Sequence, residues 1–312
     1  MGEILVVGSL NMDFVIEVNK MPKEGETILG KSLTTVPGGK GANQAFAIGK
    51  LGGNVSMIGA VGKDIYGETL INNLNSVKVN TEGIYRSEIY NTGNAFITVN
   101  DKGENSITVI SGSNNCVNRD LIKEYEYLID RCEIVVMQLE IPMEVVEYVA
   151  SIAKEKGKRV ILDPAPAPKE LSESLLKNTD IIKPNEVELS ELTGMKTDTI
   201  DDVILAARSL IKKGANTVIV TMGERGSVIV SSDEYHFFES EKVLAVDTTA
   251  AGDSFIAAFS LALNNGKNIK EAVEFGNKVS SIVVTRKGAQ TSIPSKDEVL
   301  KIYRDNGGNR NE

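Results

Sequence analysis

The sequence predicts an α/β protein with a doubly wound, mostly parallel sheet and a small β-sheet lid. Three observations support this fold class. Apolar runs of strand length alternate with helical segments, most regularly over residues 130–221. Several of these runs end in polar residues, which suits the shared carboxyl edge of a parallel sheet. Two pairs of short strands, at 14–36 and 92–110, have no helix between their members, so we expect them to form the lid.

Composition narrows the possible classes of protein. We expect one domain over residues 1–304 and a disordered tail at 305–312, which is polar and rich in glycine and asparagine. The formal net charge of −9 argues against a nucleic-acid partner, and no apolar run reaches transmembrane length. Two cysteines are too few for a disulfide framework or a structural zinc site, and the single histidine, His236, excludes His-based triads and metal sites. We therefore expect a cytoplasmic protein without membrane or nucleic-acid partners.

The amino-terminal half contains the first strand and both lid segments. Residues 4–7 are a continuous apolar run, which predicts a buried parallel strand, and Asn11 and Asp13 follow at its carboxyl end. The first lid segment is expected to contain strands at 14–18 and 27–30. The second is expected to contain strands at 95–99 and 106–109 around a tight turn. Between the segments, three glycines within residues 38–41 open a helix that ends near Leu51, and they let a ligand approach the backbone closely.

The carboxy-terminal half repeats a strand–helix pattern. Strands are expected at 133–137, 159–162, 180–182 and 217–220. Helices are expected at 143–156, 171–176, 187–193 and 201–213. This order predicts a parallel sheet that is covered by helices on both faces.

The stretch from 246 to 259 carries the clearest chemical signal. Residues 243–246 are expected to end a strand, and apolar residues at helical spacing begin a helix at about Gly252. Small side chains leave the backbone N–H groups of residues 250–253 bare at the positive end of the helix dipole, which favours anions. Asp253 then has two interpretations: it favours the helix N-terminus, or it is a base beside an anion hole. This stretch alone leaves both open.

Six short motifs occur in an order that resembles the ribokinase-like (PfkB) carbohydrate kinases. The first three are Asn11-x-Asp13, residues 38–43 (Gly-Gly-Lys-Gly-Ala-Asn) and residues 62–67 (Gly-Lys-Asp-x-x-Gly). The others are Pro184-Asn185-x-x-Glu188, residues 221–226 (Thr-Met-Gly-x-x-Gly) and residues 247–253 (Asp-Thr-x-Ala-Ala-Gly-Asp). The resemblance extends to about Pro294, and residues 137–140, 164–167 and 285–290 narrow it to the ribose-specific members. Three residues depart from the usual pattern of the family: Ala250, Ile256 and Asn277.

The resemblance implies ATP-dependent phosphorylation of D-ribose at O5, which gives D-ribose 5-phosphate and ADP. Asp253 would be the base, beside an anion hole formed by Ala250, Ala251, Gly252 and Asp253 itself. The ribose-binding residues that it implies are Asn11, Asp13, Gly39, Lys40, Asn43, Glu140 and Asp253. The implied nucleotide-binding residues are Asn185, Glu188, Thr221, Gly223, Gly226, Gly252 and Asn277.

Two cations and a homodimer are also implied. Mg²⁺ would be held at Glu188 through water, and a monovalent cation, K⁺, would lie among mainly backbone oxygens. The residues implied for the K⁺ site are Asp247, Thr249, Val283, Arg286, Gly288 and Ser292. The lid strands expose apolar residues that one small sheet cannot bury, which predicts a homodimer joined lid to lid, as the resemblance also implies. These residues are Phe14, Ile16, Val18, Phe96, Ile97 and Val99.

Other functions remain open from the sequence. The alternative acceptors are 2-deoxyribose, fructose and a nucleoside, although an aromatic content of 5% without tryptophan disfavours a stacked nucleobase. A catalytically silent sugar- or nucleotide-binding regulator is a different class, and the presence of Asp253 argues against it. A dinucleotide-dependent oxidoreductase is disfavoured because residues 8–11 lack the required glycines.

Overall fold

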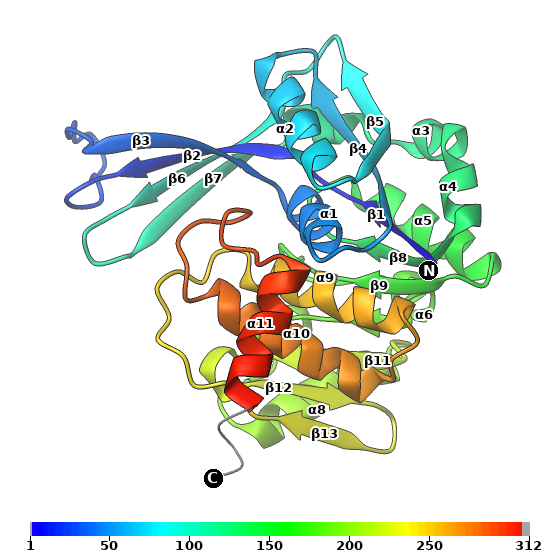
Figure 1. The fold of residues 1–312 in the computed structure, drawn as a ribbon. Helices are drawn as coiled ribbons and strands as arrows, with labels where there is room; N and C mark the ends of the chain where they lie inside the picture. Colours follow the sequence, from blue (N-terminus) through cyan, green and yellow to red (C-terminus); the bar gives the residue numbers. More distant parts are fainter. Residues whose placement is uncertain (1, 308–312) are drawn as a thin grey trace.

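Within residues 2–307, which the computed structural model describes, a nine-stranded sheet runs through the centre of the molecule (Figure 1). All neighbouring strands are parallel except at β12, which is antiparallel to both of its neighbours. From one edge to the other, the strands are β13 (Tyr235–Phe238), β12 (Ser227–Val230), β11 (Thr217–Thr221), β10 (Ile181–Ile182), β9 (Arg159–Leu162), β8 (Cys132–Met137), β1 (Glu3–Val7), β4 (Val55–Gly62) and β5 (Asn80–Ser87).

Helices cover both faces of this sheet, because successive strand residues point to opposite sides. In β1, Ile4 and Val6 join one core, whereas Leu5 and Val7 join the other, and all four are fully buried. The first core is covered by α1 (Lys40–Lys50), α2 (Ile65–Ser76), α9 (Ala251–Asn264), α10 (Ile269–Val283) and α11 (Lys296–Gly307). The second is covered by α3 (Arg119–Glu124), α4 (Glu126–Arg131), α5 (Met143–Glu155), α6 (Glu173–Lys177), α7 (Glu186–Thr193) and α8 (Ile200–Lys212). The predicted doubly wound α/β fold is confirmed.

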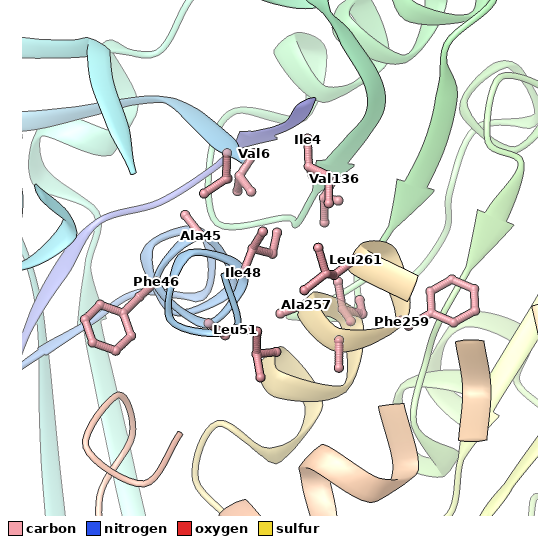
Figure 2. Packing of buried hydrophobic residues seen from close by; sticks show 14 of the residues in the cluster. Ile4, Val6, Ala45, Phe46, Ile48, Leu51, Val136, Ala257, Phe259 and Leu261 are labelled. Atoms are coloured by element: carbon pink, nitrogen blue, oxygen red, sulfur yellow. The ribbon is translucent and has the colours of Figure 1, made fainter. Parts of the chain in front are cut away.

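Helices α1 and α9 pack side by side on the first face (Figure 2). Ile48 of α1 lies across from Ala257 and Leu261 of α9, while Ala45 points towards Val6 of β1, and all these side chains are buried. The first turns of both helices therefore meet at the same end of the sheet, where Asn43 of α1 bonds directly to Asp253 of α9.

The lid is a separate four-stranded sheet that projects from the body (Figure 1). Its order is β3 (Ser32–Gly38), β2 (Asn11–Glu17), β6 (Gly93–Val99) and β7 (Asn105–Ile110), with two antiparallel hairpins joined by the parallel pair β2–β6. The small sheet expected from the two lid segments is thus confirmed. The strand expected at 27–30 is wrong, because the ladder with β2 starts at Ser32, and Leu29 is 90% exposed.

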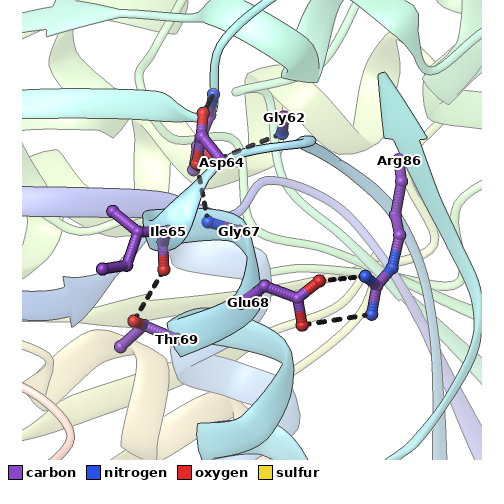
Figure 3. A network of polar contacts seen from close by, with 8 residues as sticks. Gly62, Asp64, Ile65, Gly67, Glu68, Thr69 and Arg86 are labelled. Atoms are coloured by element: carbon purple, nitrogen blue, oxygen red, sulfur yellow. Dashed lines mark hydrogen bonds and ion pairs between the residues drawn. The ribbon is translucent and has the colours of Figure 1, made fainter. Parts of the chain in front are cut away.

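Asp64 joins the lid to the main sheet (Figure 3). It caps α2 by accepting a hydrogen bond from the Gly67 N–H (2.9 Å). Its carboxylate also accepts from the N–H (2.8 Å) and the hydroxyl (2.7 Å) of Thr92, the residue before β6. These hydrogen bonds outweigh partial burial and lower the pKa of Asp64. The motif at residues 62–67 therefore fixes the point at which the lid leaves the body.

Two further expectations need correction or restriction. Residues 243–246 do not form a strand: within residues 2–307 they pair with no strand of either sheet, and Leu244 is 86% exposed. Helix α11 continues to Gly307, so residues 305–307 of the expected disordered tail are helical, and residues 308–312 lie outside the described part. None of the helices within residues 2–307 has both the length and the apolar character needed to cross a membrane.

Candidate active site

Polar side chains that follow four neighbouring strands gather at the carboxyl edge of the sheet. Ser9 follows β1, Glu140 follows β8, Asp163 follows β9 and Lys183 follows β10. The Ser9 hydroxyl donates to Glu140 Oε2, and the ammonium of Lys183 lies 3.4 Å from Asp163 Oδ1. These contacts place the four residues in one continuous polar edge, where open α/β sheets bind ligands.

Asp253 stands opposite this edge, in the first turn of α9. Its side chain is almost entirely buried, with a residue exposure of 6%. Oδ2 accepts a hydrogen bond from Asn43 Nδ2 and Oδ1 accepts one from Gln44 Nε2, each at 3.0 Å. Burial raises the pKa of Asp253 and nearby Asp163 adds to this, while the charge of Lys40 and the two amide donors partly offset the effect. The carboxylate is therefore fixed in orientation and more basic than an exposed aspartate.

Gln44 connects Asp253 to the strand ends. The same Nε2 group that bonds Asp253 also donates to Asp163 Oδ2 at 2.9 Å, and Gln44 Oε1 accepts from Gln138 Nε2 at 2.6 Å. Sequence reasoning missed Gln44, Gln138, Asp163 and Lys183 as site residues. Three of them could have been predicted from their positions, because Gln138, Asp163 and Lys183 directly follow predicted strands.

The residues implied for sugar binding lie where the lid meets α1. Asn11 is 2% exposed, and its Oδ1 accepts from Asn114 Nδ2 at 2.8 Å. Gly39 has a positive φ of 87°, and a Cβ there would lie 2.7 Å from the Asn11 nitrogen, so only glycine fits. The next N–H, that of Lys40, donates to Glu140 Oε2 at 3.0 Å.

Charge is concentrated around this region. Asp13 lies against Gly38, and burial, with repulsion from Glu140 and Asp253, raises its pKa to about 7. Burial lowers the pKa of Lys40, but the surrounding carboxylates outweigh burial and raise this pKa. Asp253 contributes most among them. The structure therefore brings the implied sugar-binding residues together around a lysine that stays charged.

The backbone amides that we expected to form an anion hole lie at the start of α9. Ala250 is the N-cap of α9 and adopts a left-handed conformation (φ 60°, ψ 11°). Within residues 2–307 the N–H groups of Ala250, Gly252 and Asp253 have no hydrogen-bond acceptor, so they are available to an anion. The N–H of Ala251, which we expected to contribute, instead donates to the Thr248 carbonyl at 3.2 Å.

The residues implied for nucleotide binding lie together beyond β10 and β11. Asn185 caps α7 in a reciprocal pair with Glu188, with distances of 2.8 and 2.9 Å. A parallel bridge joins Asn185 to Thr221. Gly223 and Gly226 have positive φ angles of 54° and 95° in the loop that follows. Asn277 of α10 donates to the Ser227 hydroxyl at 2.9 Å, which brings α10 next to this loop.

Glu188 has a structural role in addition to the proposed metal role. One oxygen of its carboxylate accepts from the Asn185 N–H and so caps α7. Burial raises the pKa of Glu188 and nearby Asp163 adds to this, while the charge of Lys183 opposes it. Within residues 2–307 no group of three or more His, Cys, Asp or Glu side chains is placed to hold a metal ion. A divalent ion near Glu188 would therefore depend on water and phosphate oxygens, as Mg²⁺ commonly does.

The two loops implied for a monovalent cation are in direct contact. Asp247 accepts from the N–H and hydroxyl of Thr249 (2.9 and 2.6 Å) and from the N–H of Gly288 (2.8 Å). The Arg286 side chain turns to Glu298, while its N–H donates to the Val283 carbonyl at 3.0 Å. The Ser292 hydroxyl donates to the Ala289 carbonyl. These contacts join the two loops beside the start of α9.

A buried base beside free amides suits the transfer of a phosphoryl group to a hydroxyl, because charge develops where the amides point. Comparison with known proteins agrees: the model of the pfkB family carbohydrate kinases matches residues 1–296. The chain belongs to the pfkB family of carbohydrate kinases, and it is therefore a sugar kinase.

Individual relatives cover almost the whole chain. A ribokinase of Haemophilus influenzae is 40% identical over 299 residues, which are 96% of this chain and 97% of the relative. A deoxyribokinase of Salmonella typhi is 39% identical over 296 residues, with coverage of 95% and 97%. Among solved structures, the ribokinase of Arabidopsis thaliana complexed with ribose and ATP has a TM-score of 0.89 at 34% identity, with coverage of 97% of this chain and 99% of the other.

Lowering the pH from about 8 to about 6 should stabilise the ligand-free protein through Asp13. The pKa of this carboxyl is raised from 3.8 to about 7, so in this range the folded state binds more protons than the unfolded state. The stabilisation is complete below the unfolded pKa and is lost as the pH rises through the folded pKa. Over the two pH units it amounts to about 1 kcal/mol in the free energy of unfolding.

Urea denaturation at both pH values, in the parent and in Asp13→Asn, measures this contribution. We expect the parent to gain more stability on acidification than the variant does. The same pH dependence in both proteins would contradict the raised pKa of Asp13.

Proposed function

We propose that this sugar kinase is a cytoplasmic enzyme that transfers the γ-phosphoryl group of ATP to O5 of D-ribose. The observation that carries the proposal is the buried carboxylate of Asp253, oriented by Asn43 and Gln44 beside the free amides of α9. Ribokinases among the relatives, and a neighbour whose structure holds ribose and ATP, support this substrate pair. The relative that is a deoxyribokinase supports 2-deoxyribose as the second candidate.

In the mechanism, Asp253 takes the proton from the C5 hydroxyl, which attacks the γ-phosphorus in line. The N–H groups of Ala250, Gly252 and Asp253 stabilise the charge on the phosphoryl oxygens. The raised pKa of Asp253 makes it a better proton acceptor as the hydroxyl reacts. Lys40 keeps its positive charge beside this carboxylate and limits the accumulation of negative charge in the site. Bound Mg²⁺, held at Glu188, would supply further charge for the phosphates.

We propose that Asn11, Asp13, Gly39, Lys40, Asn43 and Glu140 hold the sugar. A polyol needs fixed donors and acceptors if one hydroxyl is to be selected among several. Asn11 and Glu140 are already held by Asn114, Ser9 and the Lys40 N–H, so they are oriented before the sugar arrives. For the nucleotide, we propose the loop from Thr221 to Gly226 at the end of β11, together with Asn185 and Asn277. Asn185 bridges to Thr221, and Asn277 of α10 bonds to Ser227, which follows the loop.

The ratio of kcat/KM for D-ribose to that for 2-deoxyribose tests the choice of sugar. A missing hydroxyl leaves a buried polar group without its partner, at a cost of about 1–3 kcal/mol, or roughly 5- to 150-fold. We expect ribose to be preferred by a factor in this range. The ratio should fall in Asn11→Met, which replaces an amide by an apolar side chain. Equal use of both sugars by the parent would make the ribose assignment wrong, and an unchanged ratio in the variant would remove Asn11 from the recognition of the hydroxyl.

Replacement of the base should affect turnover far more than folding. Asp253→Asn keeps the size and the helix-capping character of the residue, and it should lower kcat by about 10²- to 10⁴-fold. Asp201→Asn is the matched control, because Asp201 is also an acid in the first turn of a helix, α8, but is exposed. We expect the control to keep parental kcat. Near-normal turnover in purified, folded Asp253→Asn would mean that Asp253 only favours the helix N-terminus.

We also propose that K⁺ binds between the loops of Asp247–Thr249 and Val283–Ser292. Asp247 already ties both loops together beside α9, so a bound ion would order the anion hole. Rates measured in KCl and NaCl at equal ionic strength test this, with a higher rate expected in KCl and equal rates counting against a site.

The lid supports our proposal of a homodimer. Four apolar side chains of the lid strands are largely exposed: Leu33 (63%), Ile107 (55%), Val109 (49%) and Ile110 (52%). Of the residues that we expected to be exposed on the lid, Phe96 is exposed (37%), Phe14, Ile16, Ile97 and Val99 are half-buried, and Val18 is buried (3%). The exposed apolar side chains lie on both faces of the lid: the strand register puts Ile107 and Val109 on the face of Ile97, and Leu33 and Ile110 on the face of Phe96. Exposed apolar surface of this kind is unfavourable in a monomer.

Light scattering at micromolar concentration should give twice the chain mass of 33.7 kDa. The variant Ile107→Asp should shift the mass towards that of a monomer, because it buries a charge in the proposed contact. Leu205→Asp is the control, because Leu205 is an exposed apolar side chain on α8, and it should leave the mass unchanged. A monomeric parent would refute the dimer.

A further inference from the structure

Lys183 is a buried lysine that the mechanism above does not use. It directly follows β10, where its N–H donates to the Leu162 carbonyl, and only 4% of the residue is exposed. Its backbone position is therefore fixed by the sheet. Lysine is among the residues that are least often buried, because its charge loses hydration. A lysine in this position needs a compensating partner.

The protein provides only part of that compensation. The nearest carboxylate oxygen, Asp163 Oδ1, is 3.4 Å from the ammonium, and within residues 2–307 it has no hydrogen-bond partner. The other oxygen of Asp163 is bound by Gln44. An ammonium has three donors, so one long contact leaves donor capacity unused.

The ammonium also lies at the opening of the anion hole. A Cβ built on Gly252 would be 3.3 Å from Lys183 Nζ, which places the charge beside the first turn of α9. The amides of Gly252 and Asp253, which have no acceptor among the described residues, belong to the same turn. Two independent sets of unused donors, one charged and one from the backbone, thus lie close together. Their natural common ligand is an oxyanion.

We propose that Lys183 binds the γ-phosphoryl group of ATP together with the amides of α9, and that Asp163 positions the lysine. The proposal rests on the proposed kinase function and adds a phosphate ligand to it. Asp163 is joined through Gln44 to Asp253, so a single hydrogen-bonded chain sets the distance between the phosphate-binding cation and the base. Neither Lys183 nor Asp253 can move away from the other without breaking one of these contacts.

The competing interpretation is that Lys183 only neutralises Asp163. In that case its loss would affect stability, and nucleotides with and without a γ-phosphate would be affected alike. Isothermal titration of ADP and of the non-hydrolysable β,γ-imido analogue of ATP, with Mg²⁺ and without sugar, separates the two roles. In Lys183→Met we expect affinity for the analogue to fall by about 10- to 100-fold, with ADP affinity changing by less than about 3-fold.

A second variant guards against loss of folding. Lys183→Met leaves Asp163 as an unpaired buried charge, whereas Lys183→Met with Asp163→Asn removes both charges. The double variant should show the same selective loss of the analogue. Lys213→Met is the matched control, because Lys213 pairs with Glu170 at an exposed position, and it should bind both nucleotides like the parent.

Equal losses for the analogue and ADP in the double variant, or no loss for either, would overturn the role of Lys183. Failure of the kinase proposal would look different: the parent would bind both nucleotides but would not phosphorylate ribose. Active parent enzyme with unchanged nucleotide discrimination in the double variant would contradict the Lys183 proposal alone.

Discussion

The site depends on the two amide hydrogen bonds that hold the carboxylate of Asp253. They come from consecutive residues of α1, Asn43 and Gln44, and reach the first turn of α9. The contact between α1 and α9 brings the two helix starts to the same sheet edge, where these bonds form. Asn43 is itself held by Gln290 at 3.0 Å, and Gln44 by Gln138 at 2.6 Å, so both amides that hold the carboxylate are anchored to other parts of the chain. A carboxylate fixed in this way needs little reorganisation in the proposed reaction.

A second constraint is charge. The chain carries a net charge of −9, and the site itself gathers several carboxylates, yet its proposed substrate is a polyphosphate. The overall charge of the protein therefore does not attract the nucleotide, and local positive groups must bind its phosphates. The structure offers Lys40, whose charge is strengthened by the surrounding carboxylates, the free amides of α9, and Lys183. Burial raises the pKa values of Asp13 and Asp253, and the crowding of negative charge around them adds to the effect.

Much of this arrangement follows from local sequence patterns. Continuous apolar runs identify the parallel strands because both of their faces are buried, and the small residues before Asp253 identify the start of α9. The errors occurred where tertiary pairing decides. Residues 27–30 and 243–246 are apolar enough for strands, but neither stretch forms part of a ladder in the described part of the chain. Likewise, Gln44 resembles any polar residue on a helix, and its link between Asp163 and Asp253 exists only once three segments are folded together.

A crystal structure with ribose, ADP, Mg²⁺ and a planar phosphoryl mimic would show whether Asp253 is the base for the sugar hydroxyl. We predict that an oxygen of Asp253 lies within about 2.6–3.2 Å of O5 of the sugar, with Asn43 and Gln44 still bonded to the carboxylate. A sugar whose O5 contacts a different residue, with Asp253 beyond hydrogen-bonding reach, would show that Asp253 is not the base.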